Sequence, residues 1–250
     1  MRKNKILIAT LSAVFAIVMV ISVFMMFTVK KVEVDFTVYT DTDKTVSLQE
    51  QFNQFTGKNL IFFDTDKVEK VDVGPEFEIT SVEKSFPNVI KVKVSERKAR
   101  FSFEFGGKTY VISNQGYVLR EAKEGENLLK INLSNVIANE PVLGQKLSSD
   151  HDEDLYNALT LADVEGVVDA SKEMTVEYVG RTMRSVIFLT KTDVKIRIPM
   201  AIEYGDQKTS AGFTAYFNED RDYIKSYNEI RVDAQKDGNE IRLNVVWVQQ

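Results

Sequence analysis

The chain has 250 residues, which is room for one large domain or two small ones beside an anchor. Its 32 basic and 37 acidic residues give a net charge of −5, and this balance argues against a dedicated nucleic-acid-binding protein. The chain contains no cysteine and a single histidine, which excludes disulfides, cysteine-bound metals and multi-histidine metal sites. We therefore predict neither a cofactor nor a metal centre.

The first segment of the chain has the pattern of a membrane anchor. From Ile6 to Phe27 there is no charged residue, glycine or proline, and a helix of that length crosses the roughly 30 Å hydrocarbon core of a bilayer. The alternative is a cleaved signal peptide, but its apolar region is usually about 7 to 15 residues long and ends in a small-residue cleavage site. Basic residues before the run predict a cytoplasmic tail over residues 1–5 and an extracytoplasmic position for residues 28–250.

The segment after the anchor, residues 28–98, has the pattern of a small two-layer α/β unit. Alternating apolar and polar side chains over residues 32–38 predict a strand that follows the anchor directly. A capping box at residues 47–50 predicts the start of one helix, whose apolar face carries Leu48, Phe52 and Phe55. A hydrophobic staple predicts a second helix from Asp64 to Gly74, with Val68 and Val71 facing the core. Two strands, at residues 79–86 and 89–95, follow. Three strands with one apolar face require the two helices to cover it.

The last of these strands carries a resemblance to a known family. Residues 85–97, SFPNVIKVKVSER, resemble the end of the POTRA domain of the FtsQ/DivIB bacterial cell-division proteins. The stretches GKNLIF at residues 57–62 and YVISNQGYV at residues 110–118 are also similar to that family. The chain departs from the family at Lys98, where a proline is common. The resemblance implies an α+β fold, with an N-terminal transmembrane helix, a POTRA-like β-α-α-β-β domain and a larger, mostly antiparallel β-domain with one or two helices.

The larger domain is predicted over residues 99–250. Alternation and turn residues predict a β-meander first, then a helix that carries Leu155, Leu159 and Ala162. A second helical segment is predicted around residues 213–227. The expected strands cover residues 101–105, 110–112, 117–119, 129–133, 174–179, 185–189, 194–198, 229–233 and 241–247.

One cluster invites a catalytic or metal-binding interpretation. His151 is flanked by carboxylates at residues 150–154, which would raise its pKa and suit acid–base work. The simpler interpretation is that these acidic residues occupy the first turn of a helix, where its partial positive charge favours them. A calcium site is a further alternative, although the Asp-x-Asp-x-Asp-Gly spacing of a loop site is absent. Carboxylate pairs for glycoside hydrolysis are not singled out by any spacing.

The final strand is the predicted partner-binding site. A C-terminal strand has no successor, so at a sheet edge its free N–H and C=O groups can pair with a strand of another protein. The alternative is that this strand is internal or covered. The resemblance implies that the edge receives a strand from small coiled-coil division proteins of the FtsB/DivIC and FtsL types. The predicted partner-binding residues are Ile230, Arg231, Ile241, Leu243, Val245 and Trp247.

Together these features predict a single-pass type II membrane protein enriched at the division septum and anchored in the lipid bilayer by Ile6 to Phe27. We expect a non-enzymatic scaffold that binds coiled-coil partners and so helps to organise the septal peptidoglycan synthases. One alternative is a membrane-anchored extracytoplasmic hydrolase that uses His151 or a carboxylate pair. Another alternative is a POTRA-bearing assembly factor unrelated to division.

Overall fold

The computed structural model describes residues 2–38, 43–134, 138–148, 155–180, 182–199, 203–237 and 240–249. Contacts divide the chain into two compact units, Met1–Glu96 and Arg97–Gln250. Each unit has a hydrophobic core of its own and mixes helices with strands, which confirms the predicted α+β class.

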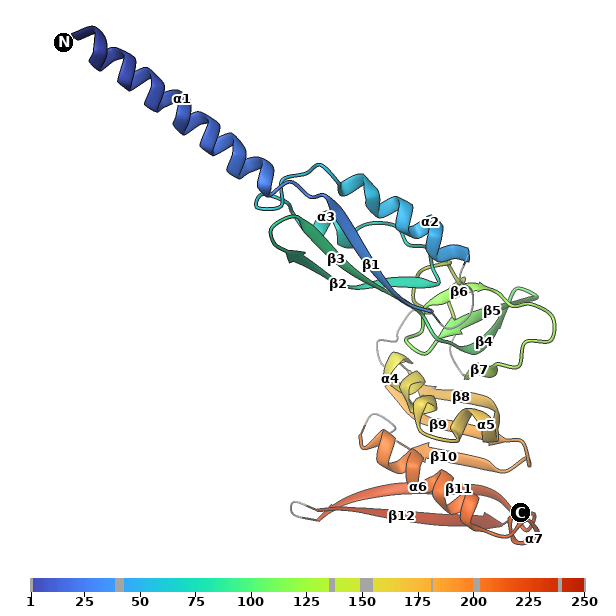
Figure 1. Ribbon diagram of the computed structural model, residues 1–250. Helices are drawn as coiled ribbons and strands as arrows, with labels where there is room; N and C mark the ends of the chain where they lie inside the picture. The colour runs from blue at the N-terminus through green and yellow to red at the C-terminus, as the bar shows by residue number, and fades with distance from the viewer. Residues whose placement is uncertain are drawn as a thin grey trace. The chain divides into compact units, whose positions relative to one another are not determined.

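The first unit follows the predicted order of strand, helix, helix, strand and strand after an N-terminal helix (Figure 1). Its sheet has the order β1-β3-β2, so β3 is central, parallel to β1 and antiparallel to β2. The elements are α1 (Arg2–Met26), β1 (Lys31–Thr37), α2 (Asp43–Phe52), the 3-10 turn η1 (Asn53–Phe55), α3 (Asp66–Glu69), β2 (Phe77–Ser85) and β3 (Val89–Glu96).

The helix α1 is a single element whose apolar side chains from Leu11 to Met26 are exposed. In the part of the chain that the structure describes, no helix has both the length and the hydropathy needed to cross a membrane. The anchor over residues 6–27 therefore remains a prediction.

The core of the first unit lies between its sheet and its helical segments. Ile90, Val92 and Val94 of the central strand are buried, while Lys91 and Lys93 between them are exposed, as the alternation predicts. From the other layer, the predicted core residues Leu48, Phe52, Phe55 and Val68 are buried, and Val71 is partly buried against them. Burial of each large apolar side chain stabilises the folded state by about 1.5–3 kcal/mol. Because such burial dominates the stability of the unit, the apolar pattern of the sequence identified its core.

The limits of both predicted helices were wrong. The helix α2 begins at Asp43, four residues before the predicted cap, and Ser47 lies inside it with its hydroxyl donating to the Lys44 carbonyl at 2.9 Å. A serine within a helix makes this bond back to the preceding turn instead of capping. The second helix is a single turn, Asp66–Glu69, preceded by a turn in which the Asp66 N–H donates to the Asp64 carboxylate at 3.2 Å.

The second unit contains a nine-stranded sheet with the order β12-β11-β10-β9-β8-β7-β4-β5-β6. Five of its eight strand pairings are antiparallel and three are parallel. The elements are β4 (Ala99–Phe105), β5 (Lys108–Ser113), β6 (Val118–Glu121), β7 (Leu129–Ser134), α4 (Leu155–Thr160), the 3-10 turn η2 (Leu161–Asp163), α5 (Val167–Ala170), β8 (Ser171–Val179), β9 (Thr182–Thr190), β10 (Lys195–Pro199), α6 (Gly205–Asn218), α7 (Arg221–Ile224), β11 (Tyr227–Asp237) and β12 (Glu240–Gln249).

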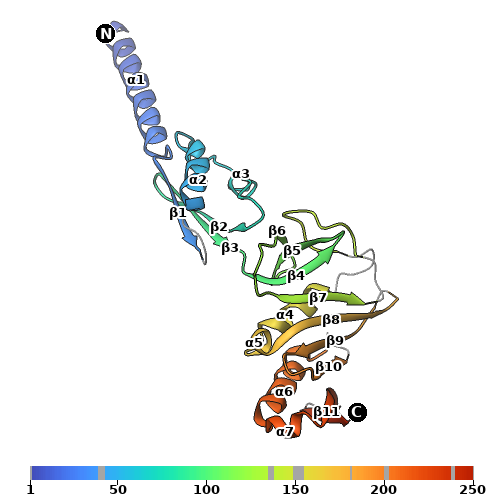
Figure 2. The same cartoon turned by 90° about the vertical axis from the view of Figure 1, so that its right-hand side faces the viewer.

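The helices α4, α5 and α6 cover one face of this sheet (Figure 2). Close packing of α6 depends on Gly212, because a Cβ atom there would lie 2.8 Å from Cγ2 of Ile196 and 3.0 Å from Cγ2 of Val232. The limits predicted for the helix around residues 213–227 were also wrong. The helix α6 begins earlier, at Gly205, and Tyr227 already belongs to β11. The opposite face of the sheet carries polar side chains in β8 to β11.

The loop after β6 contains a carboxylate whose ionisation is coupled to the fold. Arg120 donates two hydrogen bonds to the carboxylate of Glu126, at 2.8 and 2.5 Å, and the N–H of Lys123 donates a third at 2.9 Å. The Arg120 hydrogen bonds outweigh the opposing effect of burial and, with the Lys123 N–H, lower the pKa of Glu126 to about 2. The charged form of Glu126 therefore stabilises the folded state.

We expect Glu126→Gln to lower the free energy of unfolding by about 1 kcal/mol at neutral pH. Because the folded-state pKa lies below the ordinary value of 4.5, this contribution is present above about pH 4.5 and is lost as the pH falls toward 2. Urea unfolding between pH 7 and pH 3 should show the gap between wild type and variant narrowing. Glu124→Gln is the matched control, and a gap that stays constant with pH contradicts the prediction.

Candidate partner-binding site

The last strand, β12, lies at the end of the nine-stranded sheet and, among the strands that the structure describes, pairs only with β11 (Figure 1). The two strands form a long antiparallel hairpin in which Asp237 pairs with Glu240 and Glu229 with Val248. On its other side β11 pairs with β10 over residues 229–231 alone. The pairing of β11 with β12 is therefore longer than the pairing of β11 with β10. One side of β12 has no neighbouring strand among the described residues, so its outward N–H and C=O groups form an open edge.

The predicted site residues of β12 divide into an exposed and a packed pair. Ile241 and Leu243 are 40% and 38% exposed, near the tip of the hairpin. Val245 and Trp247 are half-buried and pack against the core of the second unit, on the face that the helices cover. The strand therefore presents apolar side chains beside its open edge while its other end is held by the core.

An aromatic cluster holds the C-terminal half of β12. The Trp247 ring lies 5.6 Å from the Tyr223 ring and 5.2 Å from the Tyr227 ring, measured between centroids. The Tyr227 hydroxyl donates to the Tyr223 hydroxyl at 3.0 Å. The hydrogen bond with Tyr227 is the main cause of a raised pKa at Tyr223. Sequence reasoning missed Tyr223, and the only signal for it was its position four residues before Tyr227.

Ile230 and Arg231, the predicted site residues outside β12, point to opposite faces of β11. Ile230 is fully buried in the core, so it lies behind the edge and is not available to a partner. Arg231 lies on the open face, where its guanidinium donates to the Glu229 carboxylate at 3.0 Å. Arg231 is also directly across the ladder from Val246 of the edge strand. Of these two residues, Arg231 alone is exposed beside the edge strand.

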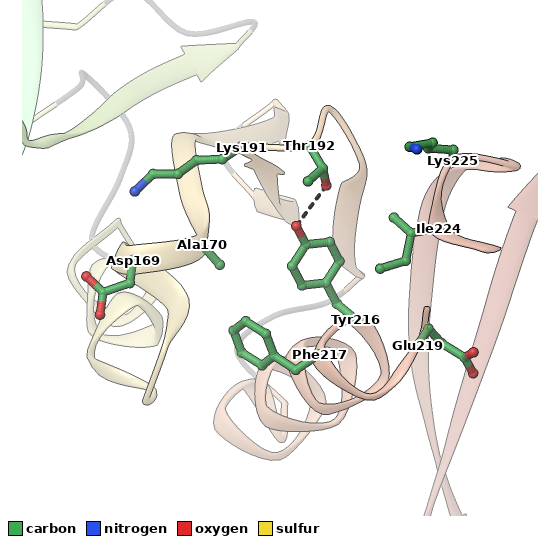
Figure 3. A pocket seen from close by; sticks show the side chains of 9 residues that line it. All are labelled: Asp169, Ala170, Lys191, Thr192, Tyr216, Phe217, Glu219, Ile224 and Lys225. Carbon is green, nitrogen blue, oxygen red and sulfur yellow. Dashed lines mark hydrogen bonds between the residues drawn. The ribbon is translucent and has the colours of Figure 1, made fainter. Parts of the chain in front are cut away.

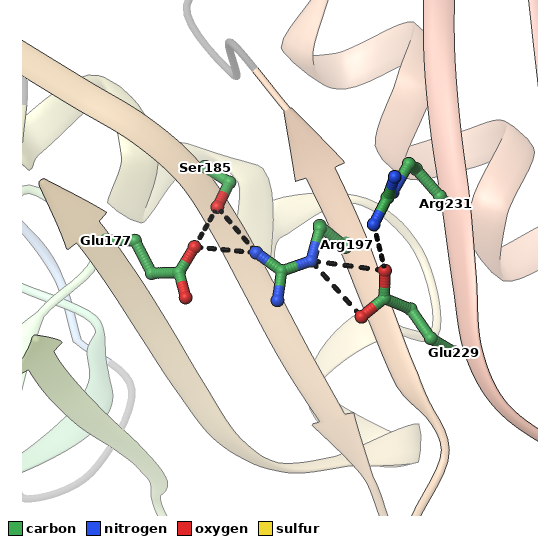
Figure 4. A network of polar contacts seen from close by, with 5 residues as sticks. All are labelled: Glu177, Ser185, Arg197, Glu229 and Arg231. Carbon is green, nitrogen blue, oxygen red and sulfur yellow. Dashed lines mark hydrogen bonds and ion pairs between the residues drawn. The ribbon is translucent and has the colours of Figure 1, made fainter. Parts of the chain in front are cut away.

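A polar network around Arg197 lies on the open face of the sheet, next to Arg231 (Figure 4). Arg197 donates to the Glu177 carboxylate at 2.6 Å and to both oxygens of Glu229 at 3.2 Å. The Ser185 hydroxyl donates to Glu177 at 2.5 Å. Because Arg231 also binds Glu229, the network connects strands β8, β9, β10 and β11. Four residues of the network line a cavity of about 460 Å³ together with Arg184, Pro199 and Asp233; they are Glu177, Ser185, Arg197 and Arg231.

The electrostatics of this network suit positioning and not acid catalysis. Burial opposes ionisation of Glu177, but the hydrogen bonds from Ser185 and Arg197 and the positive charge of Arg197 outweigh it and lower the pKa of Glu177. A general acid at neutral pH needs a raised pKa. Glu177 is therefore a permanent acceptor that holds Arg197 in place.

A second cavity, of about 780 Å³, lies on the helix side of the sheet (Figure 3). Among its lining residues, the Tyr216 and Thr192 hydroxyls are hydrogen-bonded to each other at 2.7 Å, and Phe217 is exposed. In the hydrogen bonds of the described residues, neither hydroxyl contacts a carboxylate or an amine, so neither is activated as a nucleophile. The remaining lining residues are Asp169, Ala170, Lys191, Glu219, Ile224 and Lys225.

The histidine-based catalytic alternative and the calcium-binding alternative both involve the acidic segment around His151. His151 and its acidic neighbours at residues 150–154 lie outside the described residues. Within the described ranges, no group of three or more histidine, aspartate or glutamate residues could hold a metal ion. Both alternatives for the acidic segment therefore remain predictions.

Comparison with known proteins connects the chain to bacterial cell division. No family model matches the chain. Two curated relatives are the cell division protein DivIB of Clostridium botulinum strain Hall and that of strain Loch Maree. Each is 27% identical to the chain over 190 residues, which cover 74% of the chain and 71% of the relative. This similarity, together with the motifs at residues 57–62, 85–97 and 110–118, supports the FtsQ/DivIB family of bacterial cell-division proteins as the family that the chain resembles.

Proposed function

We propose that this protein is a non-enzymatic scaffold of the division machinery that accepts a strand from a partner on the open edge of β12. The partners are small coiled-coil membrane proteins of the FtsB/DivIC and FtsL types, and through them the protein helps to organise the septal peptidoglycan synthases. The observation that carries the proposal is the position of β12 at the end of its sheet, in a chain similar to DivIB.

Binding at this edge would combine main-chain pairing with side-chain selection. The outward N–H and C=O groups of β12 would form the main-chain hydrogen bonds that give affinity in β-augmentation. On the helix-covered face, Ile241 and Leu243 would contact alternate side chains of the added strand. On the open face, Arg231 would meet a partner that approaches across Val246. Trp247 would act indirectly, since its contacts with Tyr223 and Tyr227 hold the strand in place.

The proposal includes the place of the protein in the cell. Residues 6–27 would anchor it as a single-pass type II protein, with residues 1–5 in the cytoplasm and the rest outside. The uncharged run from Ile6 to Phe27 and the exposed apolar side chains of residues 11–26 support the anchor. The strand-helix-helix-strand-strand order of the first unit supports its identification as a POTRA domain.

A fluorescent fusion at Met1, viewed in dividing cells of the source organism, tests this function. We expect a band at mid-cell that requires residues 28–250, because those residues carry the proposed partner-binding edge. A fusion that ends after residue 31 is the control and should label the envelope evenly. Even labelling of the envelope by the full chain throughout division would reject the role in division.

A further inference from the structure

The end of helix α1 is bonded directly to a loop of the first unit. The Leu60 N–H donates to the Phe27 carbonyl at 2.7 Å, and the Asn59 side-chain amide donates to the Phe24 carbonyl at 3.1 Å. The Val29 N–H in turn donates to the Lys58 carbonyl at 2.8 Å. The last carbonyls of a helix have no partners within it, so these bonds cap α1 as well as join it to the loop. The position of the loop along the axis of α1 is therefore set by hydrogen bonds.

A second turn of the first unit reaches the same end of α1. The Lys30 N–H donates to the Asn88 carbonyl at 2.9 Å, which places the turn between β2 and β3 beside the chain that leaves the helix. The Phe27 ring also meets the Phe86 ring edge to face, with 6.0 Å between centroids. Two separate turns of the first unit, residues 57–62 and 86–88, thus gather around the last turn of α1.

These two turns carry large apolar side chains that are exposed to solvent. Phe62 is 73% exposed, Phe86 59% and Ile61 45%. The Phe62 ring stacks on the Phe24 ring of α1, with 5.6 Å between centroids and 23° between planes. The exposed apolar surface of α1 therefore continues without a break onto the loop of the first unit. Isolated exposed apolar residues need no explanation, but a continuous patch of this kind marks an interaction surface.

Basic residues accompany the patch. Lys58 follows Gly57 in the capping loop and Lys30 follows Val29 at the exit from α1, and both side chains are exposed. Because the Val29 N–H is hydrogen-bonded to the Lys58 carbonyl, the two lysines lie on neighbouring segments of the chain. Exposed aromatic and aliphatic side chains bordered by lysines are the composition of surfaces that lie in the interface of an anionic membrane.

We propose that Ile61, Phe62 and Phe86 form a membrane seat, which inserts into the boundary between headgroups and acyl chains of the outer leaflet, with Lys30 and Lys58 contacting lipid phosphates. The inference rests on the anchoring of residues 6–27 proposed above, because the Phe24–Phe62 stack then holds Phe62 at the depth where the anchor leaves the bilayer. The seat would hold the first unit against the membrane instead of leaving it free to swing on the anchor.

Quenching of a single tryptophan by brominated lipids tests the seat in the full-length chain. Trp247→Phe removes the only native tryptophan, and Phe62→Trp then places a reporter in the seat. The protein is reconstituted in vesicles of phosphatidylcholine and phosphatidylglycerol, with and without brominated acyl chains. We expect brominated lipid to reduce the emission of Trp at position 62 at least twofold, with a blue shift relative to the emission of the same variant unfolded in urea.

Two matched variants separate the seat from the anchor. Val46→Trp is the negative control, because Val46 is 65% exposed on α2, which begins only after β1 has carried the chain about 20 Å away from α1. Phe15→Trp reports on the anchor itself. Quenching at position 15 without quenching at position 62 overturns the seat and leaves the anchor. Absence of quenching at position 15 overturns the anchor and the seat with it. Equal quenching at positions 46 and 62 also overturns the seat, since it indicates adsorption of the whole unit.

Discussion

Leu243→Pro is expected to weaken binding of a DivIC-like partner at least tenfold, if the N–H of Leu243 points away from β11. Proline has no N–H, so it removes one main-chain donor from the edge formed by β12. Affinity in β-augmentation comes mainly from main-chain hydrogen bonds, and we expect Leu243→Ala to cost much less than the proline. Titration of the full-length protein with the extracytoplasmic segment of the partner measures both effects.

Asn244→Pro makes this experiment decisive. In an antiparallel pair, consecutive residues alternate between pointing both main-chain groups toward the neighbouring strand and pointing both away. One of the two proline variants therefore breaks the hairpin with β11, and the other alters only the free edge. Urea unfolding shows which of the two keeps the stability of the wild type, and that variant is the one that should lose binding. Wild-type affinity in the stable proline variant would reject β12 as the site.

Phe188→Ala should lower the free energy of unfolding of the second unit by about 3–5 kcal/mol, a large fraction of what a domain of this size has. Phe188 lies in β9, near the middle of the sheet, and is fully buried. Its ring packs edge to face against Phe213 of α6, with 5.5 Å between centroids, so truncation removes both apolar burial and the contact that joins helix to sheet. Fluorescence of Trp247, the single tryptophan of the chain, follows unfolding of this unit in urea.

Phe217→Ala is the matched control for this substitution. Phe217 lies on α6, the helix that carries Phe213, and has the same side chain as Phe188, but it is mostly exposed. We expect its truncation to cost less than about 1 kcal/mol, because little apolar surface returns to water. An equal loss of unfolding free energy in Phe188→Ala and Phe217→Ala would contradict the prediction. It would mean that the packing of α6 on the sheet is not the main source of stability in this unit.

The sequence by itself determined most of the elements and their apolar faces. Alternation in residues 89–95 identified a strand and its buried face, and the apolar spacing of Leu48, Phe52 and Phe55 identified the core residues of the helical layer. Such patterns are local, so they survive in a single sequence. Helix limits were less predictable, because the hydrogen bonds that start or end a helix compete with others of similar strength. Ser47 shows this, since its hydroxyl bonds within the helix that it was predicted to cap.

Only the tertiary structure decided the composition of the candidate site. Alternation placed Ile230 and Arg231 on opposite faces of a strand, but it could not tell which face α6 covers, and Ile230 proved to be the buried one. The same holds for Arg197, whose carboxylate partners come from β8 and β11, 20 and 32 residues away in the chain. Strand order is set by packing between distant segments and leaves no periodic signal in the sequence. The position of β12 at the edge, on which the proposed function depends, is a product of that order.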